Sequence, residues 1–556
     1  MTEETEIEGY ASLWGVADLN GDVVARGAFA ATLARTGAQG VRMLHQHEGR
    51  SVVGVWDDMR EDELAYMPRT RALLADQGVT FENSFAPYPL CCPARASFLT
   101  GLYTHNHEVW SHQEPWGFQA LRDRQALPVW LQQAGYDTVF LGKYLNGYGA
   151  QPAPDGSAPD SKTYVPPGWT DWRGAIDGGL GAGHPQDGGT YRFFNTTLNA
   201  NGESFYLEPG RYQSEVFGDL SARIVAERSG DDRPFFLWAN YVAPHHGNPS
   251  EPDDPKPITR DDDKLTKYVT TARPGRVKGM FVAVITEAPG AAGEDDVSDK
   301  PFFVRELPPL NQAELDGLLE VTRQRAEALA VVDEQVEKTI AALAATGELD
   351  RTIVIFTSDN GYFLGEHRIR QGKILPYEPA LGVPLLVRGP GIPAGEVRTD
   401  PYTSIDFAPT ILEAAGAAVD WPLNGKSLLD VARYGDRGWR RAVLTESGPR
   451  GTVADLDESG PKLEARDPGP DALRFSQGIR TARYLYVEHA SDERELYDLR
   501  TDPRQFDNVV DDPDRAALVR VLARELDRLR DCAGPACRRP LPASLRTDRP
   551  VPPYRP

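Results

Sequence analysis

The 556-residue chain lacks several features that would assign its class directly. It contains no run of about 18 apolar residues, so it offers no membrane-spanning helix. It has no basic excess: 60 Lys and Arg stand against 82 Asp and Glu, and the net charge of -22 argues against nucleic acid or an anionic membrane as a partner. Its 40% apolar and 9% aromatic residues are ordinary globular usage, and its length allows two or three domains.

Cysteine is also scarce, with four residues that form two close pairs. Cys532 and Cys537 are separated by four residues, and they would close a small disulfide loop in an oxidising compartment. Reduced, exposed thiols are the other interpretation, and the sequence does not decide between them. The remaining two cysteines, Cys91 and Cys92, are adjacent.

The most informative segment is residues 91–101, with the sequence CCPARASFLTG. Pro93 suits the first turn of a helix and Gly101 suits its end, which predicts a short helix from about Pro93 to Thr100. The positive end of that helix would face Cys91, as in anion sites. Arg95 follows four residues later and can return to the same face. The alternative is a buried cysteine pair before an ordinary core helix.

Two apolar segments end in oxygen-bearing side chains. Residues 51–56 read as a buried strand followed by Asp57 and Asp58, and residues 351–357 read as another followed by Asp359 and Asn360. Ligands in open α/β sheets bind outside the carboxyl ends of strands, and hard divalent cations take oxygen ligands. These clusters therefore predict a metal site, although an acidic pair after a strand is often only a solvated turn or a helix cap.

The order Cys-x-Pro-x-Arg followed by Leu-Thr-Gly resembles the signature of the type I, formylglycine-dependent sulfatases, and the resemblance extends over about residues 55–540. It is strongest to the glucosamine-6-sulfatase and arylsulfatase branch. The resemblance implies that a separate maturation enzyme oxidises Cys91 to formylglycine, whose hydrated aldehyde is the nucleophile. It also implies a single ion, Ca²⁺ with Mg²⁺ as the alternative, bound by five residues: Asp57, Asp58, Cys91, Asp359 and Asn360.

The same resemblance implies four catalytic partners of Cys91: Arg95, Lys143, His245 and Lys373. Lys143 would hold a sulfate oxygen, Lys373 would bridge the sulfate and the leaving oxygen, and His245 would protonate the leaving alcohol, a task suited to a side chain that titrates near neutrality. Many relatives carry a histidine where this chain has Leu145, so that role is missing or is taken by Asn146. A structural histidine and a surface lysine are the alternatives for His245 and Lys373.

Together these features predict a sulfuric ester hydrolase that acts on a sulfated sugar or an aryl sulfate, with a sulfated small molecule or glycan as its partner. A phosphonate or phosphate ester hydrolase on the same scaffold is the alternative, as is a fusion with impaired activity. Strand-like runs alternate with helical patterns, notably over residues 312–346, which predicts a mostly parallel sheet covered on both faces. The resemblance implies an alkaline-phosphatase-like α/β fold sandwiched by helices, with a smaller C-terminal α+β subdomain.

The beginning of the chain departs from the sulfatase pattern. Residues 7–15, 18–24 and 40–47 resemble the opening of the prohead maturation proteases of tailed phages. We therefore interpret residues 1–55 as a truncated, non-catalytic segment of that kind, followed by a catalytic domain (56–435), a C-terminal subdomain (436–530) and a Pro/Arg-rich tail (531–556). We expect this tail to be poorly ordered from residue 538 onward. A phage assembly protein is the remaining alternative.

Two expectations concern this junction. The fusion rebuilds the first sulfatase strand from residues 51–56, where Gly54 and the bulky Trp56 are expected to weaken the strand beside the metal site. Residues 1–50 show no basic n-region followed by an apolar h-region, so we expect no signal peptide and a cytoplasmic location, whereas the family is usually secreted or periplasmic.

Overall fold

The computed structural model describes residues 50–178, 188–261, 263–419, 421–448 and 475–546. The prohead-protease-like motifs and the last ten residues lie outside these ranges. All described residues belong to one of the two units of the chain, the unit from Gly49 to Pro556. Within the described ranges, no helix is both long and apolar enough to cross a bilayer.

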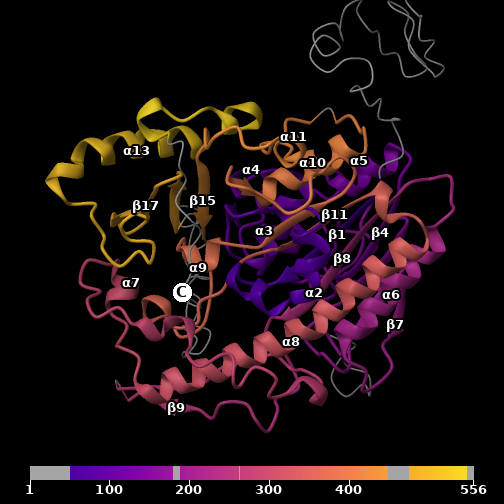
Figure 1. Ribbon diagram of the computed structural model, residues 1–556, viewed down its shortest axis with the longest axis horizontal. Coiled ribbons are helices and arrows are strands. Elements are labelled where there is room, and N and C mark those ends of the chain that lie inside the picture. Colours follow the sequence, from indigo (N-terminus) through magenta and orange to yellow (C-terminus); the bar gives the residue numbers. More distant parts are fainter. Residues whose placement is uncertain (1–49, 179–187, 262, 420, 449–474, 547–556) are drawn as a thin grey trace, which may run out of the picture. The chain divides into compact units, whose positions relative to one another are not determined.

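A ten-stranded mixed sheet forms the centre of the described unit (Figure 1). Its five central strands, β11, β1, β8, β4 and β5, are parallel to one another, whereas antiparallel pairs occur toward both edges. In spatial order the strands are β13 (Glu396–Arg398), β2 (Val79–Phe81), β12 (Leu385–Arg388), β11 (Thr352–Ser358), β1 (Arg50–Asp57), β8 (Phe235–Pro244), β4 (Asp137–Lys143), β5 (Asp171–Ala175), β6 (Thr197–Ala200) and β7 (Glu203–Tyr206).

Helices cover both faces of this sheet, as the sequence predicts (Figure 1). One face packs against α3 (Cys91–Thr100), α5 (Leu127–Gln133), α10 (Phe407–Ala414) and α11 (Leu429–Tyr434). The other packs against α6 (Gln213–Arg228) and the long α8 (Gln312–Ala345). A capping box between Asn311 and Glu314 fixes the start of α8, which confirms the predicted long helix.

Gly54 and Trp56 pack against each other in the first strand, so both fit a strand that is paired on its two sides. β1 pairs in parallel with β11 on one side and β8 on the other. The indole of Trp56 lies over Gly54, where a Cβ atom would come within 2.3 Å of the ring. The ring stacks on Phe356 at 3.8 Å and on Tyr241 at 5.6 Å between ring centroids. Since side chains alternate along a strand, Trp56 points to the opposite face from Asp57.

A second sheet of four antiparallel strands follows toward the C-terminus. It consists of β15 (Val443–Ser447), β16 (Ser476–Arg480), β17 (Tyr484–His489) and β18 (Arg494–Asp498), and it packs against α13 (Ala516–Leu529). This confirms the smaller α+β part of the predicted fold. The strand β16 was not predicted, because its polar sequence SQGIR shows no apolar alternation.

The C-terminal segment is held more firmly than its composition predicts. Cys532 and Cys537 form a disulfide. The backbone carbonyl of Cys532 accepts hydrogen bonds from His105 Nε2 at 2.9 Å and from Asn106 Nδ2 at 2.8 Å. Leu541 and Leu545 are buried against the second sheet. A poorly ordered tail from residue 538 onward is therefore the wrong expectation for residues 538–546.

Candidate active site

All nine residues singled out from the sequence are buried and converge at the carboxyl edge of the large sheet. Strand ends supply six of them, α3 supplies two and the loop after β11 supplies the last: Asp57, Asp58, Lys143, His245, Asp359, Asn360, Cys91, Arg95 and Lys373. None of the nine is left outside the cluster. Their chemical roles remain predictions from the sequence.

The ends of β1 and β11 are locked together at Asp58. This residue has a left-handed backbone with φ of 61°, which costs conformational energy in a residue other than glycine. Its N–H donates to Asp359 Oδ1 at 3.1 Å, and the next N–H, that of Met59, donates to Ser358 Oγ at 2.9 Å. These bonds turn the chain sharply, so that consecutive carboxylates of Asp57 and Asp58 both enter the site.

Two buried lysines neutralise this acidic pair. Lys143 Nζ lies 2.6 and 2.5 Å from the two carboxylate oxygens of Asp57, and Lys373 Nζ lies 2.6 and 2.7 Å from those of Asp58. Burial alone would raise the pKa of Asp58, but the positive charges of Lys373 and Lys143 outweigh it and hold the pKa well below its usual range. Burial alone would lower the pKa of Lys143, but the charge of Asp57 raises it. Lys143 is therefore a cation facing a carboxylate, and Lys373 faces the ionised carboxylate of Asp58.

Helix α3 presents Cys91 and Arg95 on the same side. Cys91 is the first residue of the helix, and Gly101 ends it with φ of 67°. The guanidinium of Arg95 donates to Asp359 Oδ2 at 2.8 Å and to the carbonyl of Lys143 at 2.8 Å. Cys91 Sγ lies 3.1 Å from Lys373 Nζ. Burial, followed by the charge of Asp57, raises the pKa of the Cys91 thiol well above its usual value, so the unmodified side chain is a neutral, weak nucleophile.

His245 has one ring nitrogen fixed and the other directed into the site. Nδ1 donates to the backbone carbonyl of His246 at 2.7 Å, because a carbonyl can only accept. Nε2 lies 3.5 Å from Asp58 Oδ2. Burial lowers the pKa of His245, so Nε2 carries a lone pair in the neutral ring. Nε2 is therefore the atom at which this side chain can take or give a proton.

The predicted metal ligands fit a hard cation. Three of the five predicted ligands, Asp57, Asp58 and Cys91, form a group with His245, which was not predicted as a ligand, and the candidate donor atoms of these four residues lie within 4.8 Å of one another. The amide nitrogen of Asn360 donates to Asp58 Oδ1 at 2.7 Å, whereas its Oδ1 is buried and has no hydrogen-bond partner among the described residues. An orphaned amide oxygen beside carboxylates is a donor set that suits Ca²⁺ or Mg²⁺.

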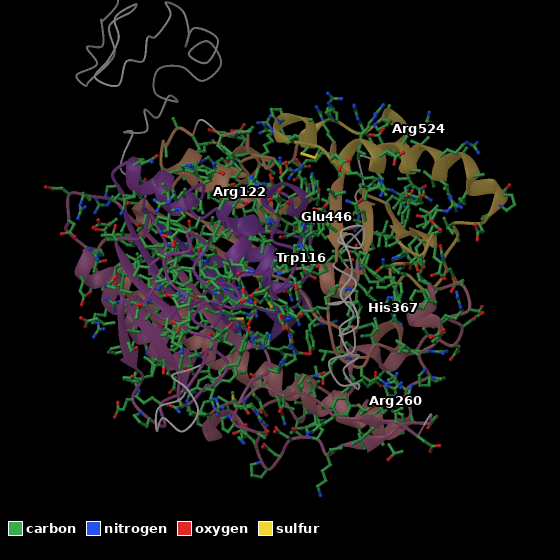
Figure 2. All side chains as sticks on the ribbon, turned by 180° about the vertical axis from the view of Figure 1, so that it is seen from behind. Trp116, Arg122, Arg260, His367, Glu446 and Arg524 are labelled. Atoms are coloured by element: carbon green, nitrogen blue, oxygen red, sulfur yellow. A yellow bond between two sulfur atoms is a disulfide. The ribbon has the colours of Figure 1, made fainter. Side chains whose placement is uncertain are left out.

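The loop that carries Lys373 is anchored to the second sheet. His367, labelled in Figure 2, bonds through Nδ1 to Glu294 Oε2 at 2.8 Å and stacks on Tyr377 at 4.3 Å between ring centroids. The hydroxyl of Tyr377 donates to Glu495 of β18 at 2.7 Å. The C-terminal part of the chain thus helps to hold a predicted catalytic lysine in place.

Three contributing residues were missed from the sequence. Arg325 of α8 donates to the carbonyl of Asp58, with 2.5 Å between Nη2 and the oxygen, and pairs with Glu63 at 2.6 Å. Tyr191 contacts Lys143 and His245. Arg325 falls on the apolar face of α8, at helical spacing from Val321, Ala328 and Leu329, which is a usable signal for a buried charge. Tyr191 lies on an irregular segment and has no comparable signal.

Comparison with known proteins shows two family matches. The sulfatase family model matches residues 52–417, and the model of the caudovirus prohead serine protease matches residues 1–68. The two matches overlap over residues 52–68, which is consistent with a chimeric chain.

The N-acetylglucosamine-6-sulfatase of Capra hircus is 30% identical over 528 residues, covering 88% of this chain and 85% of that protein. An extracellular sulfatase homologue of Drosophila melanogaster is also 30% identical, over 73% of this chain. The present chain spans about a third of that relative's length (34%).

Solved structures agree on the architecture. A protein in complex with its substrate D-glucosamine-2-N,6-O-disulfate aligns with a TM-score of 0.63 and 22% identity, covering 86% of this chain and 96% of that one. A phosphonate monoester hydrolase from Silicibacter pomeroyi aligns with a TM-score of 0.65 and 23% identity, covering 87% and 96%. The large sheet with helices on both faces, and the polar cluster at its carboxyl edge, define an alkaline-phosphatase-like hydrolase fold. Within that class, the chain belongs to the sulfatase family.

Proposed function

We propose that the protein hydrolyses the sulfate ester of a sulfated sugar. The reaction breaks the bond between sulfur and the alcohol oxygen, and one water is consumed as the alcohol and inorganic sulfate are released. The observation that carries the proposal is the position of Cys91 at the start of α3, 3.1 Å from Lys373 and within a cluster of three cations and three carboxylates. Membership of the sulfatase family and the sugar sulfatases among the relatives support it.

Two groups outside the chain's own residues belong to this proposal. A Ca²⁺ ion held by Asp57, Asp58, Asp359, Asn360 and the modified Cys91 would supply positive charge at the sulfate oxygens. Formylglycine, made from Cys91 by a separate maturation enzyme, would supply the attacking oxygen as one hydroxyl of its hydrate. The family implies a metal ion and formylglycine in general; Ca²⁺ and Cys91 are our assignments.

The other residues bind the anion and move the proton. The ammonium groups of Lys143 and Lys373 and the guanidinium of Arg95 offer preorganised positive charge where a sulfuryl group gains negative charge. His245 Nε2, which carries a lone pair in the neutral ring, takes up a proton from water and passes it to the departing alcohol oxygen, and the Nδ1 bond to the carbonyl of His246 keeps the ring oriented for this transfer.

A phosphonate or phosphate ester hydrolase is the second candidate, because a phosphonate monoester hydrolase shares the fold with a TM-score of 0.65. The test is turnover of matched aryl esters by the protein produced together with a maturation enzyme. We expect kcat/KM for the sulfate to exceed that for the phosphonate, and a glucosamine 6-sulfate to be hydrolysed as well. A protein that hydrolyses the phosphonate faster, or that hydrolyses no sulfate ester, would refute the proposed function.

We also propose that residues 1–55 take no part in catalysis. His47, the match to the protease family's catalytic histidine, precedes the described residues, and that family's serine belongs further along the chain, in sequence that already matches the sulfatases. The test is cleavage of a phage scaffold protein by the purified chain, for which we expect no activity. Cleavage that His47→Ala abolishes would contradict this interpretation.

A further inference from the structure

Tyr191 is a half-buried residue on the segment between β5 and β6, and no prediction from the sequence assigns it a role. Its backbone carbonyl accepts a hydrogen bond from the N–H of Asn248 at 2.7 Å, and the next residue, Arg192, forms an isolated bridge with Asn248. Asn248 follows His245 by three positions. The segment that carries Tyr191 is thus fixed to the chain directly after the predicted proton donor.

The side chain of Tyr191 contacts two predicted catalytic groups and a third residue beside them. Its ring centroid lies 5.0 Å from Lys143 Nζ and 4.6 Å from the ring centroid of His245. Its hydroxyl accepts a hydrogen bond from Asn146 Nδ2 at 2.7 Å. These partners come from the ends of two different strands, β4 and β8, so a single aromatic ring joins the two.

Each contact constrains its partner without using the atom that reacts. A cation–π contact attracts the ammonium of Lys143 through the ring face and leaves all three N–H donors for carboxylates or an anion. A ring packed against His245 limits rotation of the imidazole, whose Nδ1 is already tied to the carbonyl of His246. Leu145 is part of the apolar core, whereas Asn146 bonds to the hydroxyl of Tyr191.

We propose that Tyr191 is a positioning residue that aligns His245 and Lys143 for hydrolysis of the sulfate ester, and that its ring, more than its hydroxyl, performs this role. The inference rests on the proposed function for its kinetic consequence. A poor leaving group such as a sugar alcohol needs the proton from His245, whereas a nitrophenolate leaves without one. Loss of alignment therefore affects sugar sulfate more than activated aryl sulfate.

The kinetic test compares Tyr191→Leu, Tyr191→Phe and the control Phe194→Leu, which alters a ring on the same segment that packs on Tyr212. With Tyr191→Leu we expect kcat/KM to fall at least about tenfold more for glucosamine 6-sulfate than for 4-nitrophenyl sulfate. This loss is part of the roughly 10²–10⁴-fold that a well-placed general acid contributes to the rate. Tyr191→Phe and Phe194→Leu should leave that ratio unchanged. Equal losses on both substrates, or the same ratio change in Tyr191→Phe, would overturn the proposal.

A second measurement does not depend on turnover and so separates this inference from the proposed function. Proteins with ¹⁵N-labelled histidine rings report the environment of His245 by NMR. We expect the His245 signals to move in Tyr191→Leu and to stay nearly in place in Phe194→Leu, while His107, whose Nε2 bonds to Ser97, serves as an internal reference. Unchanged His245 signals in Tyr191→Leu would overturn the positioning role, whatever the enzyme hydrolyses.

Discussion

Gly54→Ala tests how the chain builds its first strand. A Cβ atom at this position would lie 2.3 and 2.6 Å from two ring atoms of Trp56, well inside van der Waals contact. The indole cannot retreat, because it is stacked between Phe356 and Tyr241. Overpacking of a core costs about 1–3 kcal/mol, against a gain of about 0.5–1 kcal/mol from replacing glycine in a strand. We therefore expect a net loss of stability.

The assay is thermal and urea unfolding of the variant beside the parent protein. Gly275→Ala is the matched control, since a Cβ there meets nothing within 4 Å, and it should unfold like the parent. Gly54→Ala combined with Trp56→Leu should recover part of the loss, because the leucine leaves room above the strand. A Gly54→Ala variant as stable as the parent would refute the argument that the absence of a Cβ atom at Gly54 makes room for the indole of Trp56.

Three further predictions address the site and its support. Arg325→Met should destabilise the protein by about 3–5 kcal/mol, because it leaves the buried carboxylate of Glu63 without its guanidinium partner. Adding Glu63→Gln should recover part of that loss in a double-mutant unfolding cycle, and strictly additive effects of the two substitutions would contradict the pairing. Chelation of divalent ions should abolish turnover, and Asp359→Ala should cripple it by several kcal/mol in transition-state stabilisation, whereas full activity with no bound metal would exclude the site. Burial lowers the pKa of His107 to about 3, so between about pH 6.5 and pH 3 the unfolded chain binds a proton that the folded protein does not. In this range the unfolding free energy should fall with falling pH by up to about 1.4 kcal/mol per unit, and His107→Gln should flatten this dependence.

The sequence was sufficient to predict the candidate site where its residues follow strands. Asp57, Asp58 and Asp359 stand directly after apolar runs, and parallel strands bring their carboxyl ends to one edge, whereas Lys143 was named through the family resemblance. The short helix at Cys91 was predictable from its proline and glycine. Local patterns of this kind can be predicted because they depend on residues that are close together in the sequence.

Residues that act across elements were not predictable in the same way. Arg325 reaches Asp58 only because α8 packs on the face of the sheet beneath it, and the sequence does not reveal that register. Tyr191 depends on how an irregular segment returns to β8. The joint packing of Gly54 and Trp56 was missed for a different reason: each residue was judged alone, although residues two apart on a strand share a face.

The mass of the peptide that contains Cys91 tests the central claim most directly. In protein produced together with a maturation enzyme, conversion of the thiol to the aldehyde should lower this mass by about 18 Da, and sulfatase activity should rise in proportion to the converted fraction. Cys91→Ser should fold and lose turnover, since serine has one hydroxyl where the hydrated aldehyde has two. Full sulfatase activity with an unmodified Cys91, or an active Cys91→Ala variant, would contradict the account.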